Sequence, residues 1–282
     1  MRRIITAAAV AFVLAYPTVH AIEVKAQVAP ALPNSRIEIA YVQPTNRSYQ
    51  PIYDRLKKRQ VLEELQRFLT PLRLSRKLSM KVDQCGATTS PYKSQGPVTI
   101  CYELIDQIEK IAANVDASLR SSAIAGAFIM VVLHEVSHAV FEIQQVPVWG
   151  RMEDAADRLA ALVMLQFDEV LALRTIFGTT IFFNASDKTW TGSDFADVSS
   201  PEEQRYYNYL CIAYGGAPIT FQGLVTPDQN GQQTLPRHRA ARCASEYRQV
   251  LKAFNLRIMP FVDPNSLVTV RSMQWLLPTD IK

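Results

Sequence analysis

The amino-acid sequence predicts an α+β fold: a mainly helical domain with a small, mainly antiparallel sheet. Two long stretches, residues 123–143 and 153–173, have the composition of helices, because the first is apolar on every side and Ala and Leu dominate the second. Three short stretches, residues 36–42, 77–85 and 97–104, alternate apolar and polar side chains with the period of a half-buried strand. The chain of 282 residues is long enough to bury one sizeable core.

The N-terminal residues have the features of a secretory signal peptide. Two arginines at positions 2 and 3 precede an apolar run, and Val19-His20-Ala21 offers a small-residue cleavage site. The apolar run is too short to span a bilayer, which needs about 20 residues. We therefore expect residues 1–21 to be a signal peptide and residues 22–35 to be a linker. The protein is expected to be exported to the periplasm or the extracellular space, with no stable membrane insertion after cleavage.

The charge balance gives no reason to expect an anionic partner. With residues 1–21 removed, the chain keeps 28 of its 30 basic side chains against 26 acidic ones, a net charge of +2. Binding to nucleic acid or to an anionic membrane surface requires a stronger excess of positive charge. We expect no nucleic-acid partner.

Other elements follow from the same periodicities. Residues 51–71 are predicted to form one helix, because apolar side chains recur at intervals of three to five. Residues 86–97 are expected to be a loop and residues 103–115 a short helix. Ser121 or Ser122 is expected to cap the apolar helix that follows.

In the C-terminal half, residues 175–200 are expected to be a loop with at most one short strand. A new helix is expected at Ser200, because the next residues are a proline and two glutamates, which favour a helix start. It should end near Tyr214, before two glycines. Another helix is expected over residues 239–255, and the last thirty residues are expected to be irregular.

All four cysteines lie outside the signal peptide, and an even number in an exported protein predicts two disulfides. Sequence proximity favours Cys85–Cys101 and Cys211–Cys243, although three pairings are possible. Each bridge is expected to contribute about 3 kcal/mol by restricting the unfolded chain. Zinc binding by the cysteines is the weaker alternative, because no CxxC spacing occurs.

The sequence HEVSH, residues 134–138, is the strongest functional signal. His134 and His138 are four residues apart, so on a helix they share one face, one turn above the other. Two imidazoles so placed can hold one Zn²⁺, with Glu135 beside the open position of the metal. Of the three histidines beyond the signal peptide, two are in this motif, which favours a metal site over a chance match.

A catalytic zinc site takes three protein ligands and keeps the fourth position for water. Glu153 opens the next helix and is the expected third ligand, and Asp157 lies one turn further along the same face. Asp157 is expected to accept the outward N–H of a ligating histidine, which fixes its tautomer. One alternative is that both acids only stabilise a helix N-terminus. Another is that His238, which lies far along the chain, supplies the third ligand.

HEVSH followed by EDAAD resembles the gluzincin pattern, HExxH with a downstream ExxxD. More closely, the chain is similar to a family of exported bacterial proteins classed as zinc metallopeptidases, whose physiological role is unknown. The likeness covers most of residues 36–250 and is carried by RIEIAYV, YDRLKKRQVLEELQRFL, TICYEL, HEVSHAVFEI, RMEDAADRLAALVML, EEQRYYNYLCIAYG and RAARC. It implies a zincin-like, small-gluzincin domain over residues 36–282, with Zn²⁺ as its cofactor, Glu153 as a ligand and Asp157 supporting a histidine.

The function that this resemblance implies is that of a zinc-dependent peptidase, an endopeptidase acting on a peptide or protein substrate. A zinc-bound water would be activated by Glu135 as general base. For the oxyanion donor the sequence offers several candidates and does not choose among them: Tyr102, Tyr206, Tyr207, Tyr214 and His238. By analogy with other zincins, the strand TICYEL would pair with the extended substrate.

Two other functions are compatible with the sequence. One is a catalytically silent, zinc-containing peptide-binding or structural protein of the cell envelope. The presence of Glu135 argues against it, because a structural zinc site has no use for a base. The other is a metal-free protein whose helix matches the motif by chance.

Overall fold

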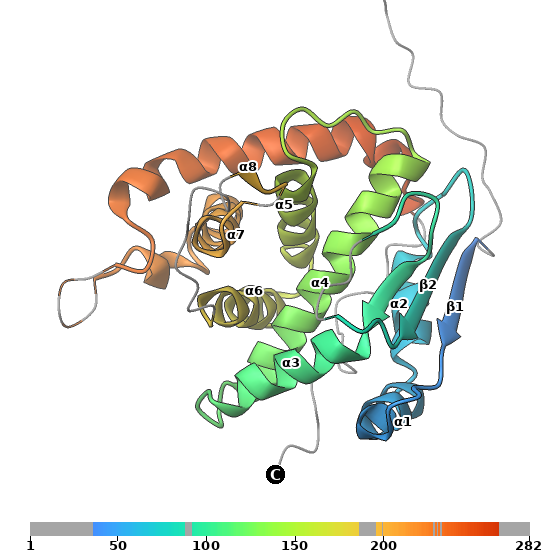
Figure 1. Ribbon diagram of the computed structural model, residues 1–282. Coiled ribbons are helices and arrows are strands. Elements are labelled where there is room, and N and C mark those ends of the chain that lie inside the picture. The colour runs from blue at the N-terminus through green and yellow to red at the C-terminus, as the bar shows by residue number, and fades with distance from the viewer. Residues whose placement is uncertain are drawn as a thin grey trace, which may run out of the picture.

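The computed structural model describes residues 36–264 except 88–91, 186–195, 199, 228, 230 and 232. The predicted signal peptide and linker, and residues 265–282, lie outside the described residues. The helices and strands are β1 (Ile37–Tyr41), α1 (Gln50–Lys58), α2 (Val61–Leu69), β2 (Leu78–Asp83), β3 (Val98–Cys101), α3 (Tyr102–Ala113), α4 (Arg120–Ile143), α5 (Met152–Met164), α6 (Glu169–Asn184), α7 (Glu202–Gly216) and α8 (Arg237–Arg257). Three short 3₁₀ helices are η1 (Arg47–Tyr49), η3 (Gln222–Leu224) and η4 (Met259–Phe261). The broad α+β prediction is confirmed, since helices predominate beside one small sheet (Figure 1).

The sheet is parallel, so the prediction of a mainly antiparallel sheet is wrong. The strand order is β1-β2-β3, with Ile39 opposite Met80 and Val82 opposite Ile100. The two connections, residues 42–77 and 84–97, are both far longer than the 2–5 residues of a hairpin loop. Because the strands are parallel, each connection must return the chain to the end of the sheet from which the preceding strand started.

The single helix predicted over residues 51–71 is two helices, α1 and α2. They are separated at Gln60, which has a left-handed φ of 53°. Buried Ile52 and Leu56 are four residues apart, but the next buried residue, Val61, follows at a spacing of five. One straight helix would turn that residue off the apolar face, so the chain breaks and starts again.

The predicted helix 153–173 and the loop 175–200 are also corrected. The first helix, α5, ends at Met164, and Asp168 caps a new helix by accepting a hydrogen bond from the Leu171 backbone N–H at 3.0 Å. The new helix, α6, continues to Asn184 through residues with low helix propensity. Its buried Thr179 hydroxyl lies within hydrogen-bond distance of two carbonyls, that of Thr175 in its own helix at 2.9 Å and that of Gly126 in α4 at 3.1 Å. The helix is therefore packed closely against α4.

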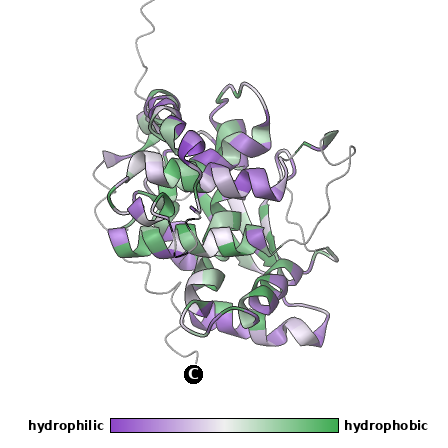
Figure 2. Ribbon diagram, turned by 90° about the vertical axis from the view of Figure 1, so that its left-hand side faces the viewer, coloured by the Kyte–Doolittle hydropathy of each residue, from purple (hydrophilic) through white to green (hydrophobic). Residues whose placement is uncertain are grey.

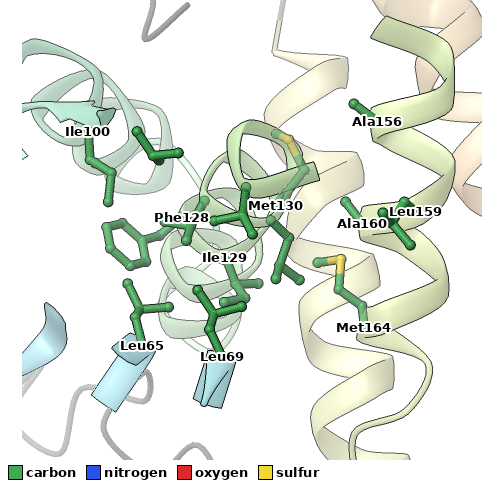
Figure 3. Packing of buried hydrophobic residues seen from close by; sticks show 14 of the residues in the cluster. Leu65, Leu69, Ile100, Phe128, Ile129, Met130, Ala156, Leu159, Ala160 and Met164 are labelled. Carbon is green, nitrogen blue, oxygen red and sulfur yellow. The ribbon is translucent and has the colours of Figure 1, made fainter. Parts of the chain in front are cut away.

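Helix α4 is the centre of the fold. In Figure 1 it crosses between the sheet with α1 and α2 on one side and α5, α6 and α7 on the other. Figure 3 shows Leu65 and Ile100 beside Phe128 on one side of α4, and Ala160 and Met164 of α5 on the other. Hydrophilic and hydrophobic bands alternate along the outer helices in Figure 2, as expected for amphipathic helices.

By length and composition, α4 is the one helix in the described part of the chain that could cross a membrane. However, 83% of its most apolar window of eighteen residues is buried inside the structure. Its apolar surface is therefore covered by the other elements of the fold. This packing is that of a core helix.

Helices α4 and α6 approach each other so closely that their contact requires two glycines. A Cβ atom on Gly178 would lie 1.8 Å from the Ser122 carbonyl oxygen, and one on Gly126 would lie 2.4 Å from the Thr175 carbonyl oxygen. Both obstacles are backbone atoms, which cannot turn aside as a side chain can. The glycines therefore set the distance between α6 and the helix that carries HEVSH.

Both disulfides join the pairs that sequence proximity favours, Cys85–Cys101 and Cys211–Cys243. The first closes the carboxyl ends of β2 and β3, which lie side by side because the strands are parallel. The second joins α7 to α8.

Candidate metal centre

The site is built by α4 and α5, and by the turn that joins them. The turn reverses the chain with two residues in the left-handed region, Gln145 at φ 52° and Gly150 at φ 100°. Glycine suits the second position because L side chains rarely adopt that conformation. Helix α5 then packs on α4, so that Glu153 in its first turn faces the two histidines of the motif.

His134, His138 and Glu153 converge on one point. The Nε2 atoms of the two histidines are 3.1 Å apart, and the Glu153 carboxylate oxygens lie 3.0 Å from His134 Nε2 and 3.3 Å from His138 Nε2. Tetrahedral ligands at 2.0–2.1 Å from a zinc ion lie about 3.3–3.4 Å from each other. The donor set and its spacing therefore fit a tetrahedral metal ion with one position left for water.

Asp157 supports the site from behind His134. The Asp157 side chain is 2% exposed, and its Oδ1 lies 2.8 Å from His134 Nδ1. A carboxylate accepts here, so Nδ1–H donates and the Nε2 lone pair faces the convergence point. Burial alone would raise the pKa of the Asp157 carboxyl, but the charge and hydrogen bonds of Arg205, with those of His134, lower that pKa to about 2.

Glu135 lies beside the ligands and keeps one oxygen without a partner. Its side chain is buried, and Oε2 is one of three buried side-chain polar atoms in the described residues with no hydrogen bond. Burial raises the pKa of the Glu135 carboxyl, while the two neighbouring histidines and the Tyr92 backbone N–H oppose that rise. Such an oxygen is free to accept a proton from a bound water.

The other possible metal group in the described residues is Cys85, Cys101 and Glu103. Its two sulfurs are already joined in a disulfide, so they are not thiolates and cannot bind a metal as such. The histidine group is therefore the candidate metal centre. His238, the alternative third ligand, lies in the first turn of α8 and is not part of this group.

A family model described as "Putative metallopeptidase" (DUF4344) matches residues 41–256. The chain belongs to this family. A metallopeptidase family implies a metal, and in this DUF4344 protein the group formed by His134, His138 and Glu153 could hold one. Searches of curated proteins and of solved structures gave no significant match.

Sequence reasoning missed Arg205 and Tyr209 of α7, which both face Asp157. Arg205 donates from Nε to Oδ2 at 2.7 Å and from Nη2 to Oδ1 at 2.8 Å, and the Tyr209 hydroxyl lies 3.5 Å from Oδ1. Their spacing of four residues puts them on one helix face. A buried carboxylate such as Asp157 in this DUF4344 protein needs a cation nearby, but the sequence alone does not single out the arginine that supplies it.

Tyr92 was also missed. Its ring lies parallel to His138, with ring centroids 6.4 Å apart, and its hydroxyl donates to Glu142 of α4 at 3.0 Å. Glu142 also accepts from the Gln95 backbone N–H at 3.2 Å and pairs with Arg76. These contacts hold the segment before β3 against α4, the helix that carries HEVSH in this DUF4344 protein.

None of the predicted oxyanion donors makes a hydrogen bond or ring contact with the metal group in the described residues. Tyr102 is buried, and its hydroxyl donates to the Val42 carbonyl at 2.6 Å. Tyr206 and Tyr207 pack on each other with ring centroids 5.1 Å apart. In the part of the chain that the structure describes, no recorded contact joins these tyrosines, Tyr214 or His238 to His134, His138 or Glu153.

The low pKa of Asp157 predicts how the metal-free protein unfolds in acid. A carboxyl with a pKa of about 2 in the folded chain and 3.8 ordinarily stabilises the fold above pH 4, and this contribution is lost as the pH falls toward 2. At 1.36 kcal/mol for each pKa unit, the loss is about 2 kcal/mol. Urea unfolding of chelator-treated protein between pH 7 and 2 measures it. Asp157→Asn should be less stable at pH 7 and should lack this part of the acid loss; equal pH dependence in both proteins would contradict the assignment.

Proposed function

We propose that this protein is a zinc-dependent peptidase, with endopeptidase activity on peptide or protein substrates. The observation that carries the proposal is the convergence of His134, His138 and Glu153 at 3.0–3.3 Å beside the unpaired carboxylate oxygen of Glu135. Two imidazoles and one carboxylate are a donor set typical of catalytic zinc, whereas Mg²⁺ and Ca²⁺ prefer oxygen ligands. An edge strand followed by a motif helix and a ligand helix supports a zincin-like arrangement.

When bound, zinc supplies a Lewis acid that polarises the scissile carbonyl and acidifies water. Glu135 takes one proton from the attacking water while the water oxygen bonds to the carbonyl carbon. The same carboxyl then returns the proton to the amine nitrogen as the C–N bond breaks. Asp157 holds His134 in place throughout, because it accepts the Nδ1–H proton at 2.8 Å.

The proposed substrate is an extended peptide that pairs with β3. This strand is at one edge of the described sheet and packs on α4, and a further strand paired with it would add to the sheet beside α4. The contacts of Tyr92 and Gln95 with Glu142 fix the segment that leads into β3. A peptide lying along that edge would continue past the site in both directions, which supports endopeptidase activity.

We also propose that the protein acts after export. Two disulfides connect separate parts of the fold, and disulfides are typical of proteins in an oxidising compartment, such as the periplasm or the cell exterior. The signal-peptide features of residues 1–21 support the same proposal.

Metal analysis with a matched pair of variants tests this function. Protein purified without added zinc should bind about one zinc ion per chain when zinc is supplied. Removal of that zinc with a chelator should abolish cleavage of a mixed peptide library. Glu153→Ala should weaken zinc binding by more than the roughly 10–100-fold that loss of an outer partner costs. Asp154→Ala removes the neighbouring acid of the same helix turn and should bind zinc normally.

Three results would contradict the proposal. Failure to bind zinc at micromolar concentration would support the metal-free alternative. Equal zinc affinity in Glu153→Ala and Asp154→Ala would mean that Glu153 only stabilises the start of α5. Tight zinc binding by the wild type with no cleavage in any library would support a catalytically silent zinc-containing protein that binds peptides or has a structural role in the cell envelope.

A further inference from the structure

Asp157 is a buried carboxylate whose hydrogen bond with His134 depends on the orientation of its side chain. It is 2% exposed, and a carboxylate removed from water is costly unless it is paired and hydrogen-bonded. The final torsion of an aspartate side chain is also soft, so burial alone does not decide where each oxygen points. His134 needs an acceptor at one place, 2.8 Å from its Nδ1. Some other group must hold the carboxylate in that orientation.

Arg205 makes the contacts that do this. Its Nε donates to Asp157 Oδ2 at 2.7 Å, and its Nη2 donates to Oδ1 at 2.8 Å, so the guanidinium grips both oxygens. A two-point contact between two planar groups fixes the plane of the carboxylate as well as its position. Oδ1, the oxygen that Arg205 Nη2 holds, is also the oxygen that His134 faces.

The Arg205 guanidinium also has a contact with an aromatic side chain. It lies over the Phe183 ring of α6, 4.7 Å from the ring centroid, and its side chain is only 18% exposed. Tyr209, one turn further along α7, is buried against the same ring, with centroids 5.5 Å apart, and its hydroxyl lies near Asp157. Arg205 is therefore fixed by α6 and α7, neither of which supplies a metal ligand.

We propose that Arg205 is a positioning residue for the metal site, acting through Asp157 on His134. The inference rests on the proposed zinc function, because it assigns Arg205 the task of aiming His134 Nε2 at the metal. A third helix, α7, thereby sets zinc affinity. Loss of the two-point grip lets the Asp157 carboxylate turn, and the hydrogen bond to His134 Nδ1 weakens.

Three variants separate this role from a general structural one. Arg205→Met removes the charge and the grip, whereas Arg205→Lys keeps a charge but cannot reproduce the planar two-point contact. Arg158→Met, on the exposed face of α5 next to Asp157 in sequence, is the control. Zinc affinity is measured by competition with a coloured chelator. We expect a loss of about 10–100-fold in Arg205→Lys and Arg205→Met, and none in Arg158→Met.

A second readout needs no zinc. In metal-free protein with ¹⁵N-labelled histidine, the Nδ1–H of His134 should give a slowly exchanging proton resonance, identified by its absence in His134→Gln. This resonance should persist in Arg158→Met and should exchange rapidly in Arg205→Lys. If the wild type shows the resonance, Arg205→Lys loses it and neither protein binds zinc, the zinc function fails, whereas the role of Arg205 in holding Asp157 against His134 is supported.

The proposal is overturned if Arg205→Lys is folded by circular dichroism, retains the protected His134 resonance and binds zinc as tightly as Arg158→Met. If Arg205→Met does not fold, the lysine variant decides alone. Should the lysine variant also be unfolded, Arg205 is a structural residue and the positioning role is rejected.

Discussion

Zinc-loaded Glu135→Gln protein should retain its metal and lose cleavage by about 10²–10⁴-fold, the range expected for removal of a general base. The amide keeps the size of the carboxylate, and Glu135 is not one of the three residues of the metal group, so we expect His134, His138 and Glu153 to stay in place. The measurement is the rate of cleavage of a peptide substrate, with zinc content determined on the same samples.

The control for this variant is Glu203→Gln, which changes an exposed glutamate on α7 and should cleave at the wild-type rate. If Glu135→Gln binds zinc and cleaves as fast as this control, Glu135 is not the base and the proposed mechanism is wrong. A variant that loses zinc as well would place Glu135 among the groups that hold the metal.

The largest expected effect on stability comes from Gly178→Ala. Inside an exposed helix this change would stabilise by about 1 kcal/mol through helix propensity. Here the new Cβ would meet the Ser122 carbonyl oxygen at 1.8 Å, so α6 must move away from α4. We expect a net loss of about 1–3 kcal/mol, as for overpacking of a core, measured by urea unfolding.

Gly223→Ala is the matched control, because no atom lies within 4 Å of a Cβ built at that position. It should be close to neutral. An unchanged or higher stability of Gly178→Ala would show that the two helices do not touch through their glycines.

Much of the fold can be predicted from periodicity alone, because burial of one face is a local property of the sequence. This holds for the three strands and for α4. The predicted pairing direction of the strands was wrong, because side chains alternate in the same way along parallel and antiparallel strands. The part of α6 beyond residue 173 was missed because its residues have low helix propensity and its packing partner, α4, is distant in sequence.

The candidate site divides in the same way. His134, Glu135 and His138 could be predicted as site residues because all three lie within five consecutive residues of one helix. Arg205 could not be placed, because its contact with Asp157 spans 48 residues and depends on how α7 packs. Tyr92 contacts Glu142 across 50 residues, and its role depends on the path of the chain before β3.

Helix α7 contains both Arg205 and Cys211, which are six residues apart. The disulfide between Cys211 and Cys243 fixes α7 against α8. Arg239 and Glu246 of α8 form an ion pair. The Cys211–Cys243 disulfide therefore constrains α7, the helix that we propose to position His134 through Arg205 and Asp157. The disulfide does this although neither cysteine belongs to the metal group.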